Sequence, residues 1–164
     1  EGLTEDEYVQ QELKRLHESG KNLVNPKNVA AIIIELVQGE GGFTVAPQAY
    51  IEGLRDFCDE HSIMLIFDEV QSGFARTGSW GAMDHYNVIP DLSTWAKSMG
   101  SGMPIATVIG KAEVMDAAAP GTIGGTYIGN PVACAASLAT IQYIKDVKLN
   151  ERGVEVGNML EINE

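Results

Sequence analysis

Two apolar segments separated by a helical pattern constrain the fold of this chain more than any other feature. The segment VAAIIIEL, Val29 to Leu36, is β-branched and almost continuously apolar, which is typical of a strand buried on both faces of a parallel sheet. A helix is then expected from Pro47, and its apolar face carries Ile51, Leu54, Phe57 and Cys58. The segment HSIMLIFDEV, residues 61–70, begins the next buried strand. The pattern predicts a β–loop–α–β unit.

Other segments continue this alternation of strands and helices. Thr4 and Glu7 have capping-box spacing at the start of a helical pattern, and Asn130 with Pro131 suits the start of another helix. The further elements that we expect are a helix over about 5–18, strands over 91–97 and 104–111, and a long helix over about 131–147. The chain is therefore predicted to be an α/β protein with a mostly parallel sheet and flanking helices.

Charge and cysteine content limit the kinds of partner. The formal net charge is −12 and the 11 basic residues are scattered, so we expect no nucleic-acid partner. No apolar run approaches the length of a membrane span, so we expect no membrane partner. Cys58 and Cys134 form no CxxC pair, which predicts neither a zinc site nor a disulfide framework and favours the cytoplasm.

Both ends of the chain have the appearance of cut ends. The first residues, EGLTEDEYVQ, include no initiator methionine and no signal-peptide pattern. The last residues, GNMLEINE, stop within a helical pattern that begins near Leu149. We therefore expect the chain to be the central piece of a longer protein.

Two adjacent carboxylates follow the second apolar segment. Ligands of open parallel sheets bind outside the carboxyl ends of the strands, and Asp68 lies where the strand IMLIF ends. Side chains alternate along a strand, so Asp68 and Val70 should point to one side and Glu69 to the other. We predict that Asp68 faces a ligand and that Glu69 is a hydrogen-bonded structural acid beneath the strand end.

A lysine follows the next expected strand. Lys97 ends DLSTWAK and precedes the glycine-rich turn SMGSGMP, so it would share one edge of the sheet with Asp68 if the two strands are neighbours. Trp95 and Met99 would partly shield the amine from water, which favours the neutral form that attacks carbonyl carbon. Such a lysine and aspartate suit pyridoxal phosphate, in which the lysine forms a Schiff base and the aspartate keeps the pyridine nitrogen protonated. A structural ion pair is the alternative from spacing alone.

Four motifs in order make the cofactor hypothesis specific. They are IELVQGEGG, FDEVQSGFARTG, DLSTWAKSMGSGMP and GGTYIGNPVACAA. Their order and spacing resemble the class III pyridoxal-phosphate aminotransferases of fold type I, especially those acting on 4-aminobutyrate. The resemblance implies that residues 1–130 are the central part of the cofactor-binding large domain. Residues 131–164 would be a long helix and the start of the connection to a small C-terminal domain.

The resemblance also implies roles for individual residues. Lys97 would be the catalytic lysine, both as the Schiff-base residue and as the proton shuttle. Asp68 would pair with the pyridine nitrogen, Val70 would pack on the ring face and Gln71 would bond the phenolic oxygen. Thr126, in the GGT motif, would contact the cofactor phosphate across a dimer interface. A homodimer with a shared active site is thus expected; the alternative from local sequence is that the GGT glycines form a simple turn.

Two further acids are implied to bind substrate. Glu40 resembles the glutamate that neutralises a distal arginine until a dicarboxylate displaces it, and Glu35 would help to hold the pocket. Leu36 stands where the family usually has proline, which leaves the rigidity of this loop open. The expected substrates are an amine donor, with 4-aminobutyrate first, and 2-oxoglutarate as the acceptor.

Several readings remain open at this level. Another ω-aminotransferase, acting on ornithine, acetylornithine or a diamine, is the alternative within the family. A non-catalytic fragment lacking the rest of the active site is the alternative outside it. His85, beside Asp84, has no spaced partner, and His17 and His61 are expected at helix ends, where a cation is favoured. We therefore assign these histidines no chemistry and predict no metal site.

Overall fold

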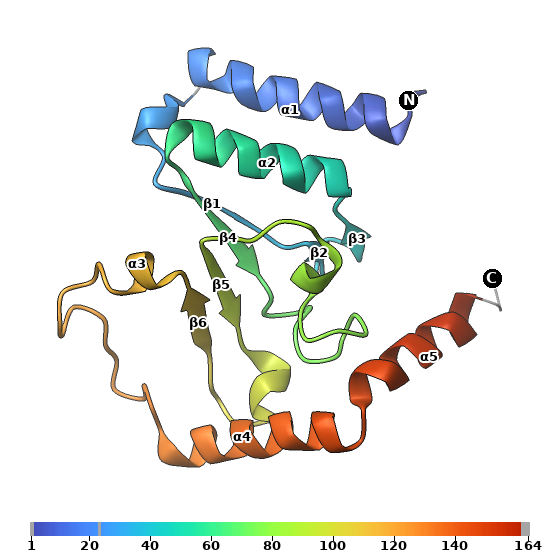
Figure 1. Ribbon diagram of the computed structural model, residues 1–164, viewed down its shortest axis with the longest axis vertical. Helices are drawn as coiled ribbons and strands as arrows, with labels where there is room; N and C mark the ends of the chain where they lie inside the picture. Colours follow the sequence, from blue (N-terminus) through green and yellow to red (C-terminus); the bar gives the residue numbers. More distant parts are fainter. Residues whose placement is uncertain (1, 23, 162–164) are drawn as a thin grey trace.

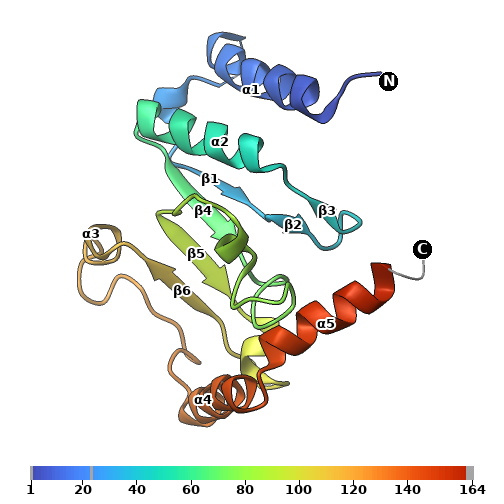
Figure 2. The same ribbon diagram turned by 45° about the vertical axis from the view of Figure 1, so that its right-hand side comes forward.

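The computed structural model describes residues 2–22 and 24–161, and a four-stranded sheet lies at its centre (Figures 1 and 2). The strands are β1 (Ala31–Ile34), β4 (Met64–Asp68), β5 (Leu92–Trp95) and β6 (Thr107–Gly110), in the spatial order β1-β4-β5-β6. The pairs β1/β4 and β4/β5 are parallel, and β6 pairs antiparallel to β5. The predicted α/β class with a mostly parallel sheet is confirmed.

The described residues also form five α-helices. Their bounds are Glu5–Asn22 for α1, Gln48–His61 for α2, Ala112–Met115 for α3, Pro131–Asp146 for α4 and Leu149–Glu161 for α5. A two-stranded hairpin is formed by β2 (Val37–Gln38) and β3 (Thr44–Val45), and short 3-10 helices span Pro26–Asn28, Ala82–His85 and Lys97–Gly100. Helix α1 packs on α2, while α4 crosses the other end of the molecule next to the third 3-10 helix (Figure 1). No helix within the described residues is long and apolar enough to cross a membrane.

Capping residues start two of these helices as the sequence predicts. The backbone N–H of Thr4 donates to Glu7 Oε2 at 2.8 Å, and the backbone N–H of Glu7 donates to Thr4 Oγ1 at 3.3 Å. The Asn130 side chain accepts from the backbone N–H of Val132 at 2.9 Å. These three hydrogen bonds satisfy backbone amide groups that have no partner inside the helix.

An apolar core joins α2 to one face of the sheet. Leu65 and Phe67 of β4 are fully buried, and they belong to the same cluster as the apolar residues of α2. The α2 side chains that the sequence placed on one helical face are all buried: Ile51, Leu54, Phe57 and Cys58. At roughly 1.5–3 kcal/mol for each large apolar side chain, this burial is the main force that holds α2 on the sheet.

The opposite face of the sheet departs from the prediction. We expected the strand at 29–36 to be buried on both faces, but the ordered strand is shorter and Ile33 is 60% exposed. Ile33 pairs with Ile66, so both lie on the face that points away from Leu65 and Phe67. Met64, on the same face, is 37% exposed. The prediction was wrong for this chain because no helix of the described residues covers that face.

A network of charges surrounds Asp91, the residue just before β5, and joins it to α2, to β4 and to the residue that follows β6. Asp91 Oδ2 accepts from Arg55 Nη1 at 2.9 Å and from the backbone N–H of Leu65 at 2.8 Å, and Asp91 Oδ1 accepts from Lys111 Nζ at 2.7 Å. Burial acts to raise the pKa of the Asp91 carboxyl. The hydrogen bonds from Lys111, Leu65 and Arg55 outweigh it and lower that pKa to about 2.

This network makes the chain sensitive to acid. A carboxyl with a depressed pKa in the folded state contributes stability above its unfolded pKa, here 3.8, and loses it as the pH falls toward about 2. We expect the free energy of unfolding to drop by about 2 kcal/mol over this range on account of Asp91. Asp91→Asn should be less stable than the native chain at neutral pH and should lose less stability over this range. Urea unfolding at a series of pH values measures this, with the exposed Asp56→Asn as control. An unchanged pH profile in Asp91→Asn would contradict the assignment.

Candidate active site

The ends of two neighbouring parallel strands bring the predicted residues together. Asp68, the last residue of β4, pairs in register with Thr94 of β5, so Lys97 follows at the same edge of the sheet. A cleft of about 100 Å³ opens there, lined by Glu35, Gly39, Glu40, Asp68, Val70, Gln71 and Lys97. Six of these seven are predicted site residues. The expectation that the aspartate and the lysine share one edge of the sheet is confirmed.

Asp68 is held in place by two hydrogen bonds. Its Oδ1 accepts from the backbone N–H of Val70 at 3.0 Å and from Thr94 Oγ1 at 3.2 Å. Asp68 and Val70 both line the cleft, whereas Glu69 does not, as the alternation of side chains predicts. Sequence reasoning missed Thr94, because its contact with Asp68 depends on the register between β4 and β5.

Glu69 fixes the loop that carries the cleft residues. Its side chain is completely buried and accepts hydrogen bonds from Ser72 Oγ, from the backbone N–H of Ala82 at 2.9 Å and from that of Met83 at 2.6 Å. The Glu69 backbone N–H also donates to the carbonyl of Thr94 at 2.9 Å. The prediction of a structural acid beneath the strand end is confirmed.

Lys97 lies in an unusual backbone conformation. Its φ is +47°, in the left-handed region, which costs a non-glycine residue of order 1–3 kcal/mol and is found most often at functional sites. The 3-10 helix that starts at Lys97 is anchored by Met99 and Gly100, both buried, and it packs against α4. The Lys97 amine donates a hydrogen bond to the Gln71 side-chain oxygen.

The exposure of Lys97 differs from the expectation. We expected Trp95 and Met99 to shield the amine partly, but the Lys97 side chain is exposed. Trp95 and Met99 are themselves buried, and neither of them lines the cleft. Lys97 is reached by solvent because no described residue covers the open side of the cleft.

The two glutamates of the QGEGG segment stand in different positions. Glu35 Oε2 accepts from the backbone N–H of Gly39 at 2.8 Å and so holds the turn between β2 and β3. Glu40 is exposed, and its carboxylate has no hydrogen-bond or ion-pair partner in the part of the chain that the structure describes. A Cβ atom at Gly39 would lie 2.8 Å from Gln71 Cγ, so only glycine allows Gln71 this position. Gly39 is a site residue that the sequence analysis did not single out.

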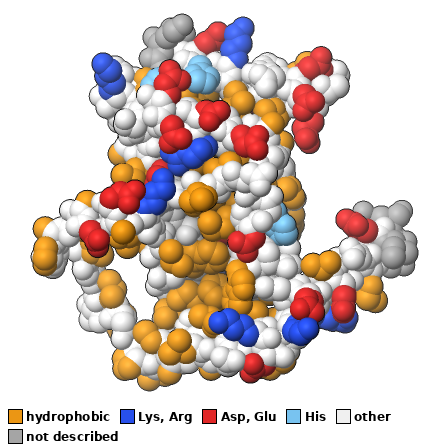
Figure 3. Space-filling view, viewed as in Figure 1, with side chains coloured by type: hydrophobic (Ala, Val, Ile, Leu, Met, Phe, Trp, Pro, Cys, Tyr) orange, Lys and Arg blue, Asp and Glu red, His pale blue; other side chains and the backbone are white. Residues whose placement is uncertain are grey.

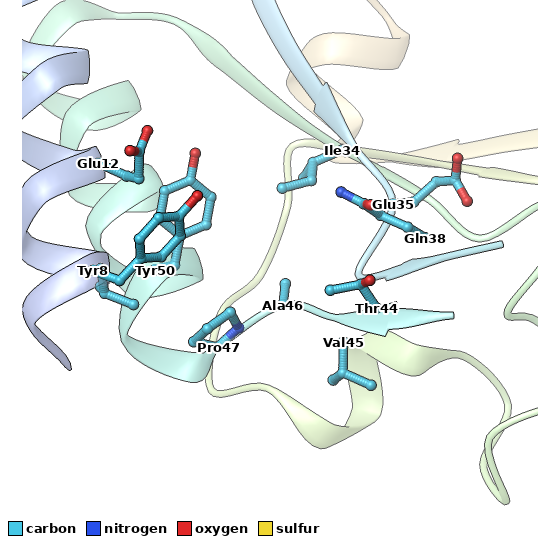
Figure 4. Close-up of a pocket in the computed structure, with 11 residues that line it drawn as sticks. Tyr8, Glu12, Ile34, Glu35, Gln38, Thr44, Val45, Ala46, Pro47 and Tyr50 are labelled. Atoms are coloured by element: carbon cyan, nitrogen blue, oxygen red, sulfur yellow. The ribbon is translucent and has the colours of Figure 1, made fainter. Parts of the chain in front are cut away.

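Glu35 also lines a second cavity, of about 390 Å³, between α1, α2 and the β2–β3 hairpin (Figure 4). Tyr8, Glu12 and Tyr50 form its far wall, and Gln38 lies beside Glu35. Burial raises the pKa of the Tyr50 hydroxyl, and the nearby Glu12 and Tyr8 add to the effect. No sequence pattern predicts this cavity, because its walls come from helices that pack together only in the tertiary structure.

Thr126 does not join the cleft within this chain. It is exposed and lines a separate cavity of about 520 Å³ with residues of the loops before β6 and α4. A phosphate contact from Thr126 to a cofactor at Lys97 therefore stays a prediction, and it depends on the second subunit that the resemblance implies.

Comparisons with known proteins agree with this geometry. Residues 3–163 match the family described as aminotransferase class-III. The chain belongs to the class III aminotransferases. It is 48% identical over 160 residues to the 4-aminobutyrate aminotransferase of Escherichia coli strain K12, covering 98% of this chain and 37% of that protein.

Other class III aminotransferases are about as similar. The 5-aminovalerate aminotransferase of Pseudomonas aeruginosa is 49% identical over 160 residues, again covering 98% of this chain and 37% of that protein. The crystal structure of ornithine aminotransferase from Toxoplasma gondii superposes with a TM-score of 0.81 at 40% identity, covering 90% of this chain and 34% of that one. The chain therefore spans little more than a third of the length of these relatives.

Class III aminotransferases depend on pyridoxal phosphate, and the residues of the cleft fit the pyridine ring and the aldehyde group of this cofactor. The cleft offers an amine in Lys97, a carboxylate in Asp68, an amide in Gln71 and an apolar side chain in Val70. Apart from Lys97, none of the described residues that line the cleft is cationic. The cofactor phosphate thus requires donors from outside this cleft.

Proposed function

We propose that this chain carries the cofactor-binding centre of an aminotransferase that moves an amino group from 4-aminobutyrate to 2-oxoglutarate. The observation that carries the proposal is the meeting of Lys97 and Asp68 at the ends of neighbouring parallel strands, with Lys97 in a strained backbone conformation. Amine and carboxylate at one strand edge are the two groups that pyridoxal-phosphate chemistry requires.

Each cleft residue has a task in this proposal. When bound, pyridoxal phosphate supplies an electron sink that stabilises the charge left by proton removal from the substrate carbon. Lys97 takes that proton and returns it during the transfer, which needs an amine free to move within the cleft. Asp68, held by the hydrogen bond from Thr94, would keep a positive charge on the pyridine nitrogen of a bound cofactor. Val70 would pack on its ring, and Gln71, which accepts a hydrogen bond from the Lys97 amine, would bond its phenolic oxygen.

The acidic side chains of the cleft favour an amine as substrate. Glu35, Glu40 and Asp68 all line it, so a cationic amine approaches with favourable electrostatics. Glu40 has a free carboxylate, which suits the proposed pairing with a cationic group supplied from elsewhere in a longer protein. We propose Glu40 and Glu35 as substrate-binding residues, Glu40 by direct pairing and Glu35 by holding the turn.

A second subunit is part of the proposal. Thr126 is placed in a loop with highly exposed apolar neighbours, as expected for an interface. The most exposed large apolar side chains of this loop and of α4 are Ile123, Tyr127, Ile128, Val132, Leu138 and Tyr143. Apolar side chains also gather on the lower half of the molecule in Figure 3. We propose a homodimer in which Thr126 of one subunit contacts the cofactor phosphate of the other.

The place of the chain in a longer protein follows the same reasoning. We propose residues 1–130 as the central part of the large domain and residues 131–164 as the start of the connection to a small domain. The uncovered sheet face at Ile33 and the open cleft support this view. A cytoplasmic location is also proposed, and the free thiols of Cys58 and Cys134 suit a reducing compartment.

The similar proteins differ in the amine donor for which they are named. Proteins of comparable similarity are named for 4-aminobutyrate, 5-aminovalerate and ornithine. The first two differ by one methylene group, which apolar pockets distinguish by only about 10- to 200-fold. Ornithine, acetylornithine and diamines place further polar or charged groups in the cleft.

We expect turnover of both 4-aminobutyrate and 5-aminovalerate with 2-oxoglutarate, with 4-aminobutyrate preferred by no more than about 200-fold in kcat/KM. Ornithine, acetylornithine and putrescine should be poorer donors. The measurement is glutamate formation by the protein of full family length, with each donor supplied separately. A lack of turnover of 4-aminobutyrate alongside turnover of ornithine would contradict the proposed donor and leave the aminotransferase chemistry in place.

A further inference from the structure

We propose that His17, Glu60 and His61 form a binding site for a divalent transition-metal ion of the zinc type. One ligand atom from each of these three side chains lies within 4.8 Å of the other two. His17 belongs to the C-terminal part of α1, and Glu60 and His61 are the last two residues of α2. Histidine side chains lie beside acidic ones over these two helices in Figure 3. The sequence offered no pattern for this site, because the two histidines come from separate helices.

The ligand types select the class of metal. Two imidazoles and one carboxylate suit Zn²⁺ and its neighbours, with a remaining position for water, whereas Mg²⁺ and Ca²⁺ prefer oxygen ligands alone. Ligand atoms around tetrahedral zinc lie roughly 3.3–3.5 Å apart, as follows from bonds of about 2.0–2.2 Å. His17 and Glu60 are exposed, so their side chains are free to rotate toward that spacing.

The surroundings hold the two imidazoles on one side. Both rings contact Phe57 edge to face: its centroid lies 5.0 Å from that of His17 and 4.6 Å from that of His61. Phe57 is only 4% exposed, so it forms a fixed floor beneath the pair. The nearby Asp59 is already paired with Arg55 at 2.8 Å and does not compete as a ligand.

Position in the helices also favours a cation. His17 lies in the C-terminal part of α1, and Glu60 and His61 are the last two residues of α2, where unpaired carbonyl groups produce a partial negative charge. A bound ion would link α1 to α2. Among the described side chains of α1, only Val9 is buried below a tenth of its surface, so this link would add to a limited apolar contact. None of the three residues lines the cleft at Lys97, so the inference is independent of the proposed function.

The test is a titration of the metal-freed chain, without a histidine tag, with Zn²⁺ by calorimetry and with Co²⁺ by visible absorbance. We expect one ion per chain and visible absorption bands typical of Co²⁺ with few ligands. The thermal unfolding midpoint should also rise on adding Zn²⁺. His17→Ala and His61→Ala should each weaken binding by at least about tenfold, since even outer-shell changes cause such losses. His85→Ala should leave binding unchanged, because His85 bonds instead to Ser79 and to the carbonyl of Thr77.

Two outcomes would overturn the proposal. One is no binding by the native chain with Zn²⁺ in excess. The other is Zn²⁺ or Co²⁺ binding that persists in both His17→Ala and His61→Ala. If His17→Ala loses helical structure by circular dichroism, His17→Gln and Glu60→Gln replace it, and metal binding that is unchanged in both of these variants would equally overturn the site.

Discussion

Replacing Lys97 with alanine is expected to lower kcat/KM of the full-length aminotransferase by at least about 10²- to 10⁴-fold, from the loss of proton transfer alone. Lys97 is the sole amine that lines the cleft among the described residues, and Gln71 already holds it toward the cleft. No neighbouring side chain can form the Schiff base in its place, since the others there are carboxylates, an amide and a valine. Lys97→Arg keeps the charge but has no readily deprotonated amine, so it should be as inactive as Lys97→Ala.

The measurements separate chemistry from folding. Steady-state transamination gives the loss of rate, and borohydride reduction with pyridoxal phosphate followed by peptide mapping should place the pyridoxyl group on Lys97. The control is Lys14→Ala, at an exposed position of α1 that pairs only with Glu18 at 3.9 Å. Label spread over surface lysines of the 164-residue chain would mean that this chain alone does not assemble the site. Activity of Lys97→Ala within about tenfold of the native enzyme would remove Lys97 from the catalytic role.

Glu69→Ala is expected to destabilise the fold by about 3–5 kcal/mol, the usual loss when one partner of a buried charged network is removed. The substitution leaves the backbone N–H groups of Ala82 and Met83 and the Ser72 hydroxyl without their acceptor, in a region closed to water. It also opens a cavity beneath the cleft. Because domains of this size are stable by only about 5–15 kcal/mol, the effect is a large part of the total.

Urea unfolding followed by circular dichroism measures this loss. Glu69→Gln keeps the shape of the side chain but turns one acceptor into a donor facing backbone N–H groups, so it should also be destabilising, though less than the alanine. Glu52→Ala, exposed on α2, serves as the control and should change stability by less than about 0.5 kcal/mol. A loss below about 1 kcal/mol for Glu69→Ala would show that the loop finds other partners for its amide groups.

The candidate site was largely predictable because its residues follow strands and alternate along them. The apolar segments ended at Asp68 and before Lys97, and parallel neighbours deliver their carboxyl ends to one edge. The four motifs then gave each position a role. The sequence could not provide the contact between Thr94 and Asp68 or the close approach of Gly39 to Gln71, because both depend on register and on the path of a turn.

Both wrong predictions concern burial, which depends on the segments that cover a residue. An apolar strand such as β1 reads as buried on both faces, yet Ile33 is exposed, since burial depends on which elements cover the sheet. The expected shielding of Lys97 failed for the same reason. Local sequence reports what a residue prefers, whereas coverage is set by segments far away in the chain.

The α/β class, the caps of α1 and α4, and the positions of Asp68 and Lys97 at strand ends follow from local sequence, because periodicity and capping act over a few residues. The partners of Glu69, the network at Asp91 and the proximity of His17 to His61 depend on the packing of the whole chain. These contacts join segments that the chain separates by many residues. No local pattern encodes them, and they exist only once α1, α2 and the sheet have packed together.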